Sequence, residues 1–256
     1  MTLRDALMVA WLGSCLSGVS SAEMTLNTPQ KAAPNSLAGR NLAADLDRKI
    51  DDLSNVVAEE SIARFVGRGK QARKLDQFQA VVEIADGVER YAELRRGSER
   101  FSNATAVDGL WSHGELATVL RVVRDGLPQV ETEFEDGEEF LSVHIAAGSR
   151  RWFLKVDNEI HWLDFDCRIF AEPATGGISR IQWVSEPLAG RTGIGTVTWD
   201  IRFSPRDIGG KIYNVPESAL YRITRNGRGD RAEWNVTTFS GYARYGSEVT
   251  VQFALE

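Results

Sequence analysis

Residues 78–94 read FQAVVEIADGVERYAEL, and this stretch decides the class of fold. Along 78–84, apolar side chains recur at every second position, which is the period of a strand with one buried face. These apolar residues are Phe78, Ala80, Val82 and Ile84. The dipeptide Asp86-Gly87 is typical of a two-residue hairpin turn and leads into a second strand over 88–94. The stretch therefore predicts an antiparallel hairpin with one face towards solvent.

Similar patterns continue to the C-terminus, and Asp136-Gly137, Asp157-Asn158 and Asn226-Gly227 mark turns between them. The further strands expected are 130–134, 139–146, 151–156, 159–170, 178–185, 195–203, 217–225, 231–239 and a last one carrying Val249, Val251, Phe253 and Leu255 on one face. Strands joined by turns rather than by helices pair antiparallel. About ten strands in one sheet curl strongly.

Two helices interrupt the strands. The first is predicted from Leu42, Leu46, Ile50, Leu53 and Val57, which recur at helical spacing, with Asn41 as N-cap. Charged residues, among them Asp45 and Arg48, fill its other side.

The second helix is predicted from a capping box, with Ser112 as N-cap and Glu115 three residues later. Apolar residues follow at helical period, and Trp111 precedes the cap as a packing residue. Gly126 is expected to close the helix in the left-handed conformation, and Pro128 prevents its continuation. Two helices and about ten strands make the predicted class α+β.

The N-terminus resembles an export signal. Arg4 precedes a short apolar run over 6–12, and Ser20 and Ala22 satisfy the small-x-small rule for cleavage after residue 22. A second interpretation stays open, because residues 12–15 read LGSC and resemble a bacterial lipobox in which Cys15 is lipidated. The sequence thus predicts a signal peptide over 1–22, or a lipoprotein leader ending before Cys15, and location in the periplasm or cell envelope.

The rest of the chain divides into a linker and one domain. Residues 23–40 are polar, contain Pro29 and Pro34 and show no period, so they are expected to be a flexible linker. Residues 41–256 form a single β-rich domain. No stretch approaches the roughly 20 apolar residues that span a bilayer. We therefore expect contact with a membrane only through a lipid anchor.

Composition narrows the class of partner. The chain has 256 residues, 43% of them apolar, and a net charge of −6 from 30 basic and 36 acidic residues. This mildly acidic balance argues against nucleic-acid binding. Of the two cysteines, Cys15 lies in the leader, so there is no disulfide framework and Cys167 is expected to be a buried structural thiol.

No motif carries a recognisable chemistry. Residues 161–167 read HWLDFDC, but the period of a strand separates His161 and Cys167 from Asp164 and Asp166, so a core strand is favoured over a metal site. The glycine-rich stretches 67–70 and 190–195 lack the spacing of a phosphate loop, and no G-x-S-x-G is present. The remaining candidates are expected on the surface, namely His113, His144 and the acidic run Glu131, Glu133, Glu135, Asp136, Glu138 and Glu139. We predict no catalytic, cofactor-binding or metal-binding residue.

A family resemblance follows from two segments. Residues 173–181 read PATGGISRI after a strand, and residues 239–248 read FSGYARYGSE. The first resembles the strand–D-P-x-T-G-x-I-x-R segment of exported bacterial proteins of the LolA-like lipoprotein-carrier superfamily, with Glu172 where Asp is usual. The second resembles the close of uncharacterised exported proteins of the same kind. The resemblance implies a strongly curved antiparallel half-barrel with helices packed on it, whose apolar inner face holds acyl chains in the carriers.

These observations leave two main hypotheses for function. The first is an exported envelope protein without a catalytic site that binds a lipid, another apolar ligand or a lipidated protein on the concave face of its sheet. The alternative is a non-enzymatic scaffold or protein-interaction domain with a filled core. An enzyme ranks third, and would gain support if Asp164 and Asp166 pointed inward.

Overall fold

The computed structural model describes residues 37–245, except for 69–70, 86–87, 103–106, 108, 113, 128–130, 136–137, 150–151, 157–158, 172–176, 189–192 and 226–230. The predicted leader, the predicted last strand over 249–255, Pro128 and His113 therefore lie outside the described residues.

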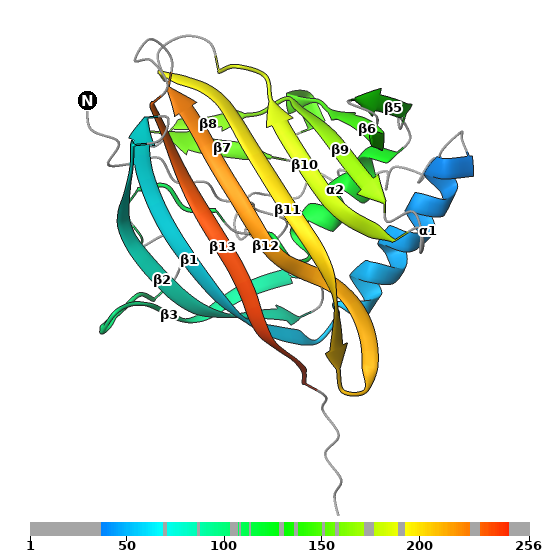
Figure 1. Cartoon of the computed structure of the whole chain (residues 1–256), viewed down its shortest axis with the longest axis horizontal. Coiled ribbons are helices and arrows are strands. Elements are labelled where there is room, and N and C mark those ends of the chain that lie inside the picture. Colours follow the sequence, from blue (N-terminus) through cyan, green and yellow to red (C-terminus); the bar gives the residue numbers. More distant parts are fainter. Residues whose placement is uncertain are drawn as a thin grey trace, which may run out of the picture.

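One large antiparallel sheet forms the body of the molecule (Figure 1). In the described part of the chain it contains eleven strands in the order β4-β3-β2-β1-β13-β12-β11-β10-β9-β6-β5. Its strands are β1 (Val56–Arg68), β2 (Gln71–Ala85), β3 (Val88–Arg96), β4 (Glu99–Arg100), β5 (Glu131–Glu135), β6 (Glu138–Ile145), β9 (Phe165–Ala171), β10 (Ile178–Ser185), β11 (Ile194–Ile208), β12 (Lys211–Arg225) and β13 (Arg231–Arg244). The sheet curves strongly and stays open between β4 and β5, so the predicted α+β half-barrel is confirmed.

Two segments far apart in the chain join in the middle of this sheet. β1 pairs with β13 along its whole length, from Val56 opposite Arg244 to Arg68 opposite Arg231. This pairing attaches the N-terminal meander β1–β4 to the C-terminal run of strands. The strand β1 itself was not predicted, although its side chains alternate between buried and partly exposed from Val56 to Arg64.

The hairpin that decided the fold class has the expected form. β2 and β3 pair antiparallel, and Ala85 lies opposite Val88 across the turn. Phe78, Ala80 and Val82 are buried on the concave side, whereas Gln79 is exposed.

The predicted strand 159–170 is in fact two strands in different sheets. β8 (Glu159–Trp162) pairs with β7 (Phe153–Val156) in a separate two-stranded sheet, and β9 belongs to the large sheet. The chain changes partner at Leu163 and Asp164, where the Leu163 amide donates to the carbonyl of Trp152. A continuous side-chain alternation does not reveal such a change, because both strands keep the same period.

The middle of the concave face is filled by aromatic rings and by the second helix, α2 (Thr118–Gly126). Trp152 packs against Trp199 and Trp183, with ring centroids 4.8 Å and 5.1 Å apart. On α2, Val119, Leu120, Val122 and Val123 are all buried. Trp183 and Trp199 alternate with other apolar residues along the predicted strands 178–185 and 195–203, which indicates core positions, and both are buried.

The first helix, α1 (Leu37–Asp52), begins four residues before its predicted N-cap, so Asn41 lies inside the helix and the linker ends sooner than expected. Its predicted apolar face is buried at Leu42 and Leu46. Val57, expected as the last residue of that face, belongs to β1. Neither α1 nor α2, the α-helices of the described residues, is long and apolar enough to cross a membrane.

The predicted capping box of the second helix is wrong. α2 begins at Thr118, six residues after Ser112, and no side chain of its own segment caps it. Instead Glu89 of β3 accepts hydrogen bonds from the amides of Ala117 and Thr118 through Oε1, at 2.7 Å and 2.8 Å. A carboxylate from another element satisfies the same orphan amides that a local cap would.

Gly126 was also misassigned, because its φ is not positive and Leu127 follows it in a right-handed conformation. The glycine is required by packing. A Cβ at this position would lie 2.9 Å from Cγ1 of Val143 on β6, so α2 approaches the sheet more closely than any other residue type allows.

Candidate functional site

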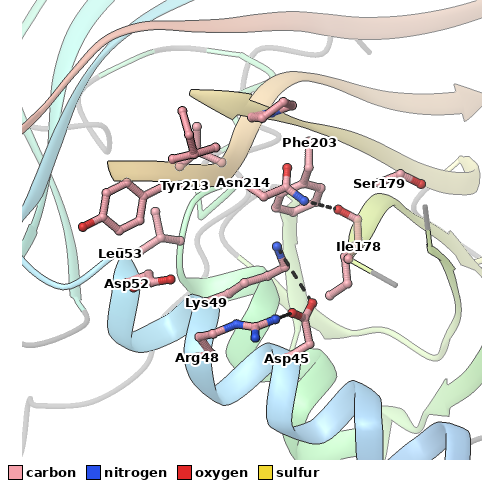
Figure 2. Close-up of a pocket in the computed structure, with 14 residues that line it drawn as sticks. Asp45, Arg48, Lys49, Asp52, Leu53, Ile178, Ser179, Phe203, Tyr213 and Asn214 are labelled. Atoms are coloured by element: carbon pink, nitrogen blue, oxygen red, sulfur yellow. Dashed lines mark hydrogen bonds and ion pairs between the residues drawn. The ribbon is translucent and has the colours of Figure 1, made fainter. Parts of the chain in front are cut away.

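A pocket opens between α1 and the ends of β10, β11 and β12 (Figure 2). Its volume is about 620 Å³, within the range of about 300–1,000 Å³ that is usual for small-molecule sites. The sheet supplies an apolar wall that continues the core, and α1 supplies the polar side of the pocket. The apolar wall contains Leu53 of the chain after α1 together with Ile178, Phe203, Pro205, Ile212, Tyr213 and Val215.

Lys49 is the most buried cation of the pocket. Only 6% of the residue is exposed, and its ammonium group points from α1 towards Phe203 and Asn214 (Figure 2). Nζ lies 5.9 Å from the centroid of the Phe203 ring and 3.9 Å from Oδ2 of Asp45. Burial lowers the pKa of Lys49, and the charge of Asp45 opposes this effect.

The carboxylates of the pocket are already paired. Asp45 accepts a hydrogen bond from Arg48 through Oδ1, and its Oδ2 is buried without a hydrogen-bond partner among the described residues. Asp52 is bonded by Lys211 at 3.0 Å. On the sheet side, the amide of Asn214 donates to the carbonyl of Ile178 at 2.7 Å and ties β12 to β10.

A second group of ionisable side chains lies near the N-terminus of α2. Glu60 of β1 and Glu115 are 2% and 1% exposed, and Glu89 has one buried carboxylate oxygen. Both carboxylate oxygens of Glu60 and both of Glu115 are buried without a hydrogen-bond partner among the described residues. Tyr91 of β3 adds a hydroxyl to this buried acidic cluster, which we define as Glu60, Glu89, Glu115 and Tyr91.

Burial shifts Glu60 and Glu115 of the cluster towards the neutral form. Burial raises the pKa of Glu115 to about 8, and repulsion from Glu89 adds to the rise. Burial likewise raises the pKa of Glu60 well above its usual range, and Glu115 and Glu89 contribute in the same direction. Among the described residues, no three His, Cys, Asp or Glu side chains are arranged to hold a metal ion. We interpret Glu60 and Glu115 as protonated residues of the core.

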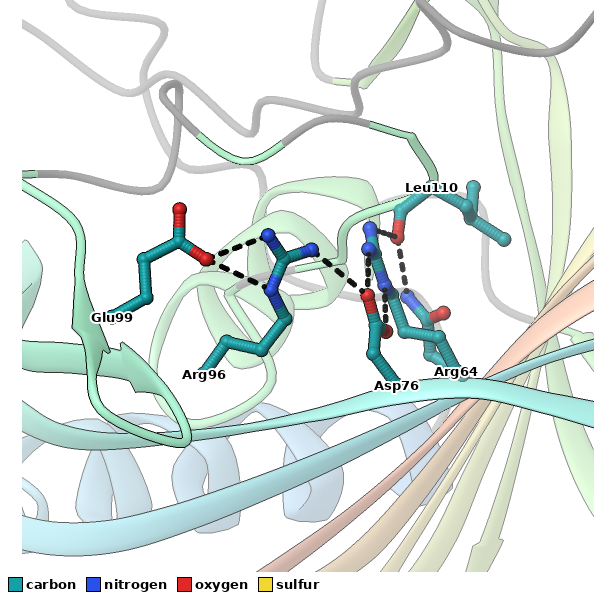
Figure 3. A network of polar contacts seen from close by, with 6 residues as sticks. Arg64, Asp76, Arg96, Glu99 and Leu110 are labelled. Carbon is teal, nitrogen blue, oxygen red and sulfur yellow. Dashed lines mark hydrogen bonds and ion pairs between the residues drawn. The ribbon is translucent and has the colours of Figure 1, made fainter.

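A third polar group links β1 to β2 and to the chain at Leu110 (Figure 3). Arg64 of β1 donates to both oxygens of Asp76 on β2, at 2.6 Å and 2.5 Å, and to the carbonyl of Leu110 at 3.3 Å. Arg96 bridges Asp76 and Glu99. Burial alone would raise the pKa of Asp76, but the hydrogen bonds and charge of Arg64 outweigh it and lower the pKa. The two cations, Arg64 and Arg96, pair with the two carboxylates, Asp76 and Glu99, so the network is electrically neutral. It therefore offers a ligand no unbalanced charge.

The residues 161–167 do not converge on a metal. Leu163, Phe165 and Cys167 are buried as predicted, whereas Asp166 is exposed. Asp164 accepts a hydrogen bond from the amide of Ala147 and so has a structural partner. The inward orientation that would have favoured an enzyme is not observed.

His144 lies on the polar face of β6, as predicted, but it is not isolated. Its Nδ1 is 3.0 Å from Oδ1 of Asp166, which lies directly opposite on β9. Both side chains are about half exposed, at 51% and 57%. Only the strand pairing brings them together, because 22 residues separate them in the sequence.

Several predicted residues lie where no side chain is described. These are Cys15, His113, Glu172 and the acidic run from Glu131 to Glu139, whose backbone forms the predicted hairpin of β5 and β6. Conversely, sequence reasoning missed Asp45 and Lys49. Asp45 was assigned to the charged side of the first helix and Lys49 was not assigned, whereas both are buried where residues of β11 and β12 face α1.

No protein-family model and no curated protein sequence matches this chain. Two solved structures are similar to it. A LolA superfamily protein from Nitrosomonas europaea matches with a TM-score of 0.37 and 12% identity, over 80% of this chain and 94% of that one. A DUF1329 family protein from Desulfovibrio piger matches with a TM-score of 0.34 and 15% identity, over 84% of this chain and 94% of that one. The first belongs to the superfamily that the sequence resembles.

Proposed function

We propose that this protein is a non-enzymatic envelope protein that binds a lipid or another apolar small molecule in the pocket beneath α1. The observation that supports this best is the pocket itself, whose apolar wall of about seven side chains continues the core and whose volume suits a small molecule. The ligand site differs from the one expected from sequence. The middle of the concave face is occupied by Trp152, Trp183 and α2, so free space lies at one end of the half-barrel.

Filling the pocket tests the proposal. Ser179 lies in the pocket wall, is half-buried and donates a hydrogen bond to the carbonyl of Phe170 at 3.2 Å. Ser179→Phe puts a ring at the wall of the cavity and removes this one hydrogen bond, but no apolar core side chain. Ser61→Phe is the matched control, because Ser61 is equally half-buried on β1, away from the pocket, where it accepts a hydrogen bond from Gln77.

The probe is dodecanol, an uncharged amphiphile, and the readout is native mass spectrometry and calorimetry of delipidated protein. We expect the unmodified protein and Ser61→Phe to bind it, and Ser179→Phe to bind at least about ten-fold more weakly. Failure of the unmodified protein to bind dodecanol or any of its charged analogues would overturn the proposal. Equal binding by both variants would place the ligand elsewhere.

A second candidate function is a scaffold domain, and the filled middle of the half-barrel supports it. Trp152, Trp183 and Trp199 are buried there and pack against one another at centroid distances of 4.8–6.1 Å. Protein purified from its own host and consistently free of bound small molecules by native mass spectrometry would support the scaffold. Co-purifying lipid would support the carrier.

Export is a separate part of the proposal and rests on Arg4, the apolar run over 6–12 and the Ser20-x-Ala22 site. We expect the mature chain in the envelope fraction, with Met1 absent by intact mass. If Cys15 carries lipid, Cys15→Ser releases the protein from membranes. A retained Met1 in the cytosol would refute export.

A further inference from the structure

Two cations, Arg48 and Lys49, and two carboxylates, Asp45 and Asp52, line the pocket beneath α1. Counted with Lys211, which bonds Asp52 from outside the lining, the group has three cations and two carboxylates. Asp45 is shared between two cations, Arg48 by a direct hydrogen bond and Lys49 at 3.9 Å. Asp52 forms an ion pair with Lys211. Because Arg48 keeps 70% of its side chain exposed to water, the charge that is both buried and incompletely compensated is that of Lys49.

The surroundings of Lys49 Nζ are poor in acceptors. Among the described residues, Lys49 Nζ forms no hydrogen bond, and its ion-pair partner, Asp45 Oδ2, lies 3.9 Å away. An ammonium group has three donors, and withdrawing it from water without hydrogen bonds is costly. From β12, Asn214 faces it with an amide already bonded to Ile178.

An anionic group next to Lys49 would remove this cost. Its oxygens would accept the free N–H groups, and its charge would balance the excess, in a site where low dielectric strengthens the attraction. The wall beyond the ammonium is apolar, with Phe203, Ile178 and Leu53 available to an attached hydrocarbon chain.

We infer that the pocket selects an amphiphile with an anionic head, a carboxylate or a phosphate, which pairs with Lys49 while its hydrocarbon tail lies against Phe203 and Ile178. This inference rests on the proposed function and deepens it. It assigns to Lys49 the role of choosing the charge of the ligand, whereas the apolar wall provides affinity for the tail.

The test compares ligands that share one tail. Dodecanoate and dodecyl phosphate are titrated against dodecanol and dodecylammonium, and acetate and inorganic phosphate serve as heads without a tail. For the unmodified protein we expect both anionic amphiphiles to bind at least about ten-fold more tightly than dodecanol, and dodecylammonium to bind most weakly. The heads alone should bind at least about a hundred-fold more weakly than their amphiphiles.

Variants assign the preference to Lys49. Lys49→Met keeps the length and apolar stem but removes the charge, and should abolish the preference for anions over dodecanol. Lys49→Arg should retain a preference for anions. Lys74→Met, at an exposed lysine of β2 bonded to Gln77, is the matched control and should behave as the unmodified protein. Circular dichroism of each variant verifies folding.

The outcomes separate the two levels of the proposal. Equal affinity for dodecanoate, dodecyl phosphate and dodecanol, or a preference for anions that survives Lys49→Met, overturns the inference about Lys49 and leaves the apolar pocket standing. Free phosphate or acetate binding as tightly as its amphiphile overturns the role of the tail. Absence of binding by every amphiphile overturns the proposed function itself.

Discussion

Cys167 lies on the concave face of β9, between Phe165 and Ile169, and its side chain is fully buried. Burial raises the pKa of its thiol well above the usual range, and the charge of Asp166 adds to the rise. A thiol that stays protonated and covered is inert towards disulfide reagents. This is the environment that the alternation along 165–169 predicted.

We therefore expect no reaction of native Cys167 with an aromatic disulfide reagent, and full reaction in denaturant. Cys167→Ala should lower the free energy of unfolding by about 1 kcal/mol, because only packing is lost. Urea titration measures the second effect. Rapid labelling of the native protein would mean that the face assignment of β9 is reversed.

Glu115 makes stability depend on pH. In the unfolded chain its pKa is near the ordinary value of about 4.3, whereas in the folded protein burial raises the pKa to about 8. Between these values the native state binds more protons than the unfolded state, so stability falls as pH rises. The stabilising effect of the proton is fully present below the lower value and is lost as pH passes the upper one.

Glu115→Gln should remove much of this loss, because an amide is neutral at every pH. We expect urea midpoints similar to those of the unmodified protein at about pH 5 and higher at about pH 8.5, by an amount on the order of a few kcal/mol in unfolding free energy. Glu93→Gln, at an exposed residue of β3, is the control and should leave the pH profile unchanged. Stability that increases from about pH 5 to 8 would contradict the assignment.

At the scale of elements, the position of α2 against the sheet depends on two remote contacts. Glu89 of β3 holds its first amides, and Arg124 near its end pairs with Asp47 of α1 at 2.7 Å. Gly126, the last residue of α2, allows the close approach to Val143. The position of α2 is therefore fixed by contacts with β3, α1 and β6 rather than by caps from its own segment.

The close approach predicts a reversal of the usual helix preference. In an exposed helix, Gly→Ala stabilises by up to about 1 kcal/mol. Here the new Cβ would meet Cγ1 of Val143 at 2.9 Å and Cγ1 of Ile145 at 3.4 Å, so Gly126→Ala should destabilise by about 1–3 kcal/mol through overpacking. Gly148→Ala, where no atom lies within 4 Å of the new Cβ, should be nearly neutral. Thermal unfolding of both variants decides between packing and propensity.

At the scale of the whole molecule, the pairing of β1 with β13 unites the two halves of the sheet. Each of these strands has a hydrogen-bonded neighbour along both edges: β1 lies between β2 and β13, and β13 lies between β1 and β12. The strands at the two edges, β4 and β5, are short and bonded on one side only.

Hydrogen exchange should follow this arrangement. We expect the slowest amides in the paired central segments of β1, β12 and β13, which open only when the molecule unfolds, and the fastest strand amides in β4, β5 and the separate pair β7–β8. Exchange measured by mass spectrometry on peptides of these strands tests the expectation. Slow exchange in β1 that is lost independently of β13 would show that the two halves are separate folding units.

The amino-acid sequence by itself determined the features that depend on neighbouring residues. The pairing of β2 with β3, the buried face of β2, the core positions of Trp183 and Trp199 and the burial of Cys167 all follow from a period of two and from turn chemistry. These signals act over a few residues, and the tertiary structure did not change them.

Only the tertiary structure decided which distant groups meet. It paired β1 with β13, divided 159–170 between two sheets, placed Glu89 at the start of α2 and covered Lys49 with strands from the other end of the chain. A charged position on a helix surface carries no local sign of whether water or another element will face it. Burial of Lys49 and Glu115, and with it their shifted pKa values, is a property of the assembled core, because desolvation depends on everything that packs around a group.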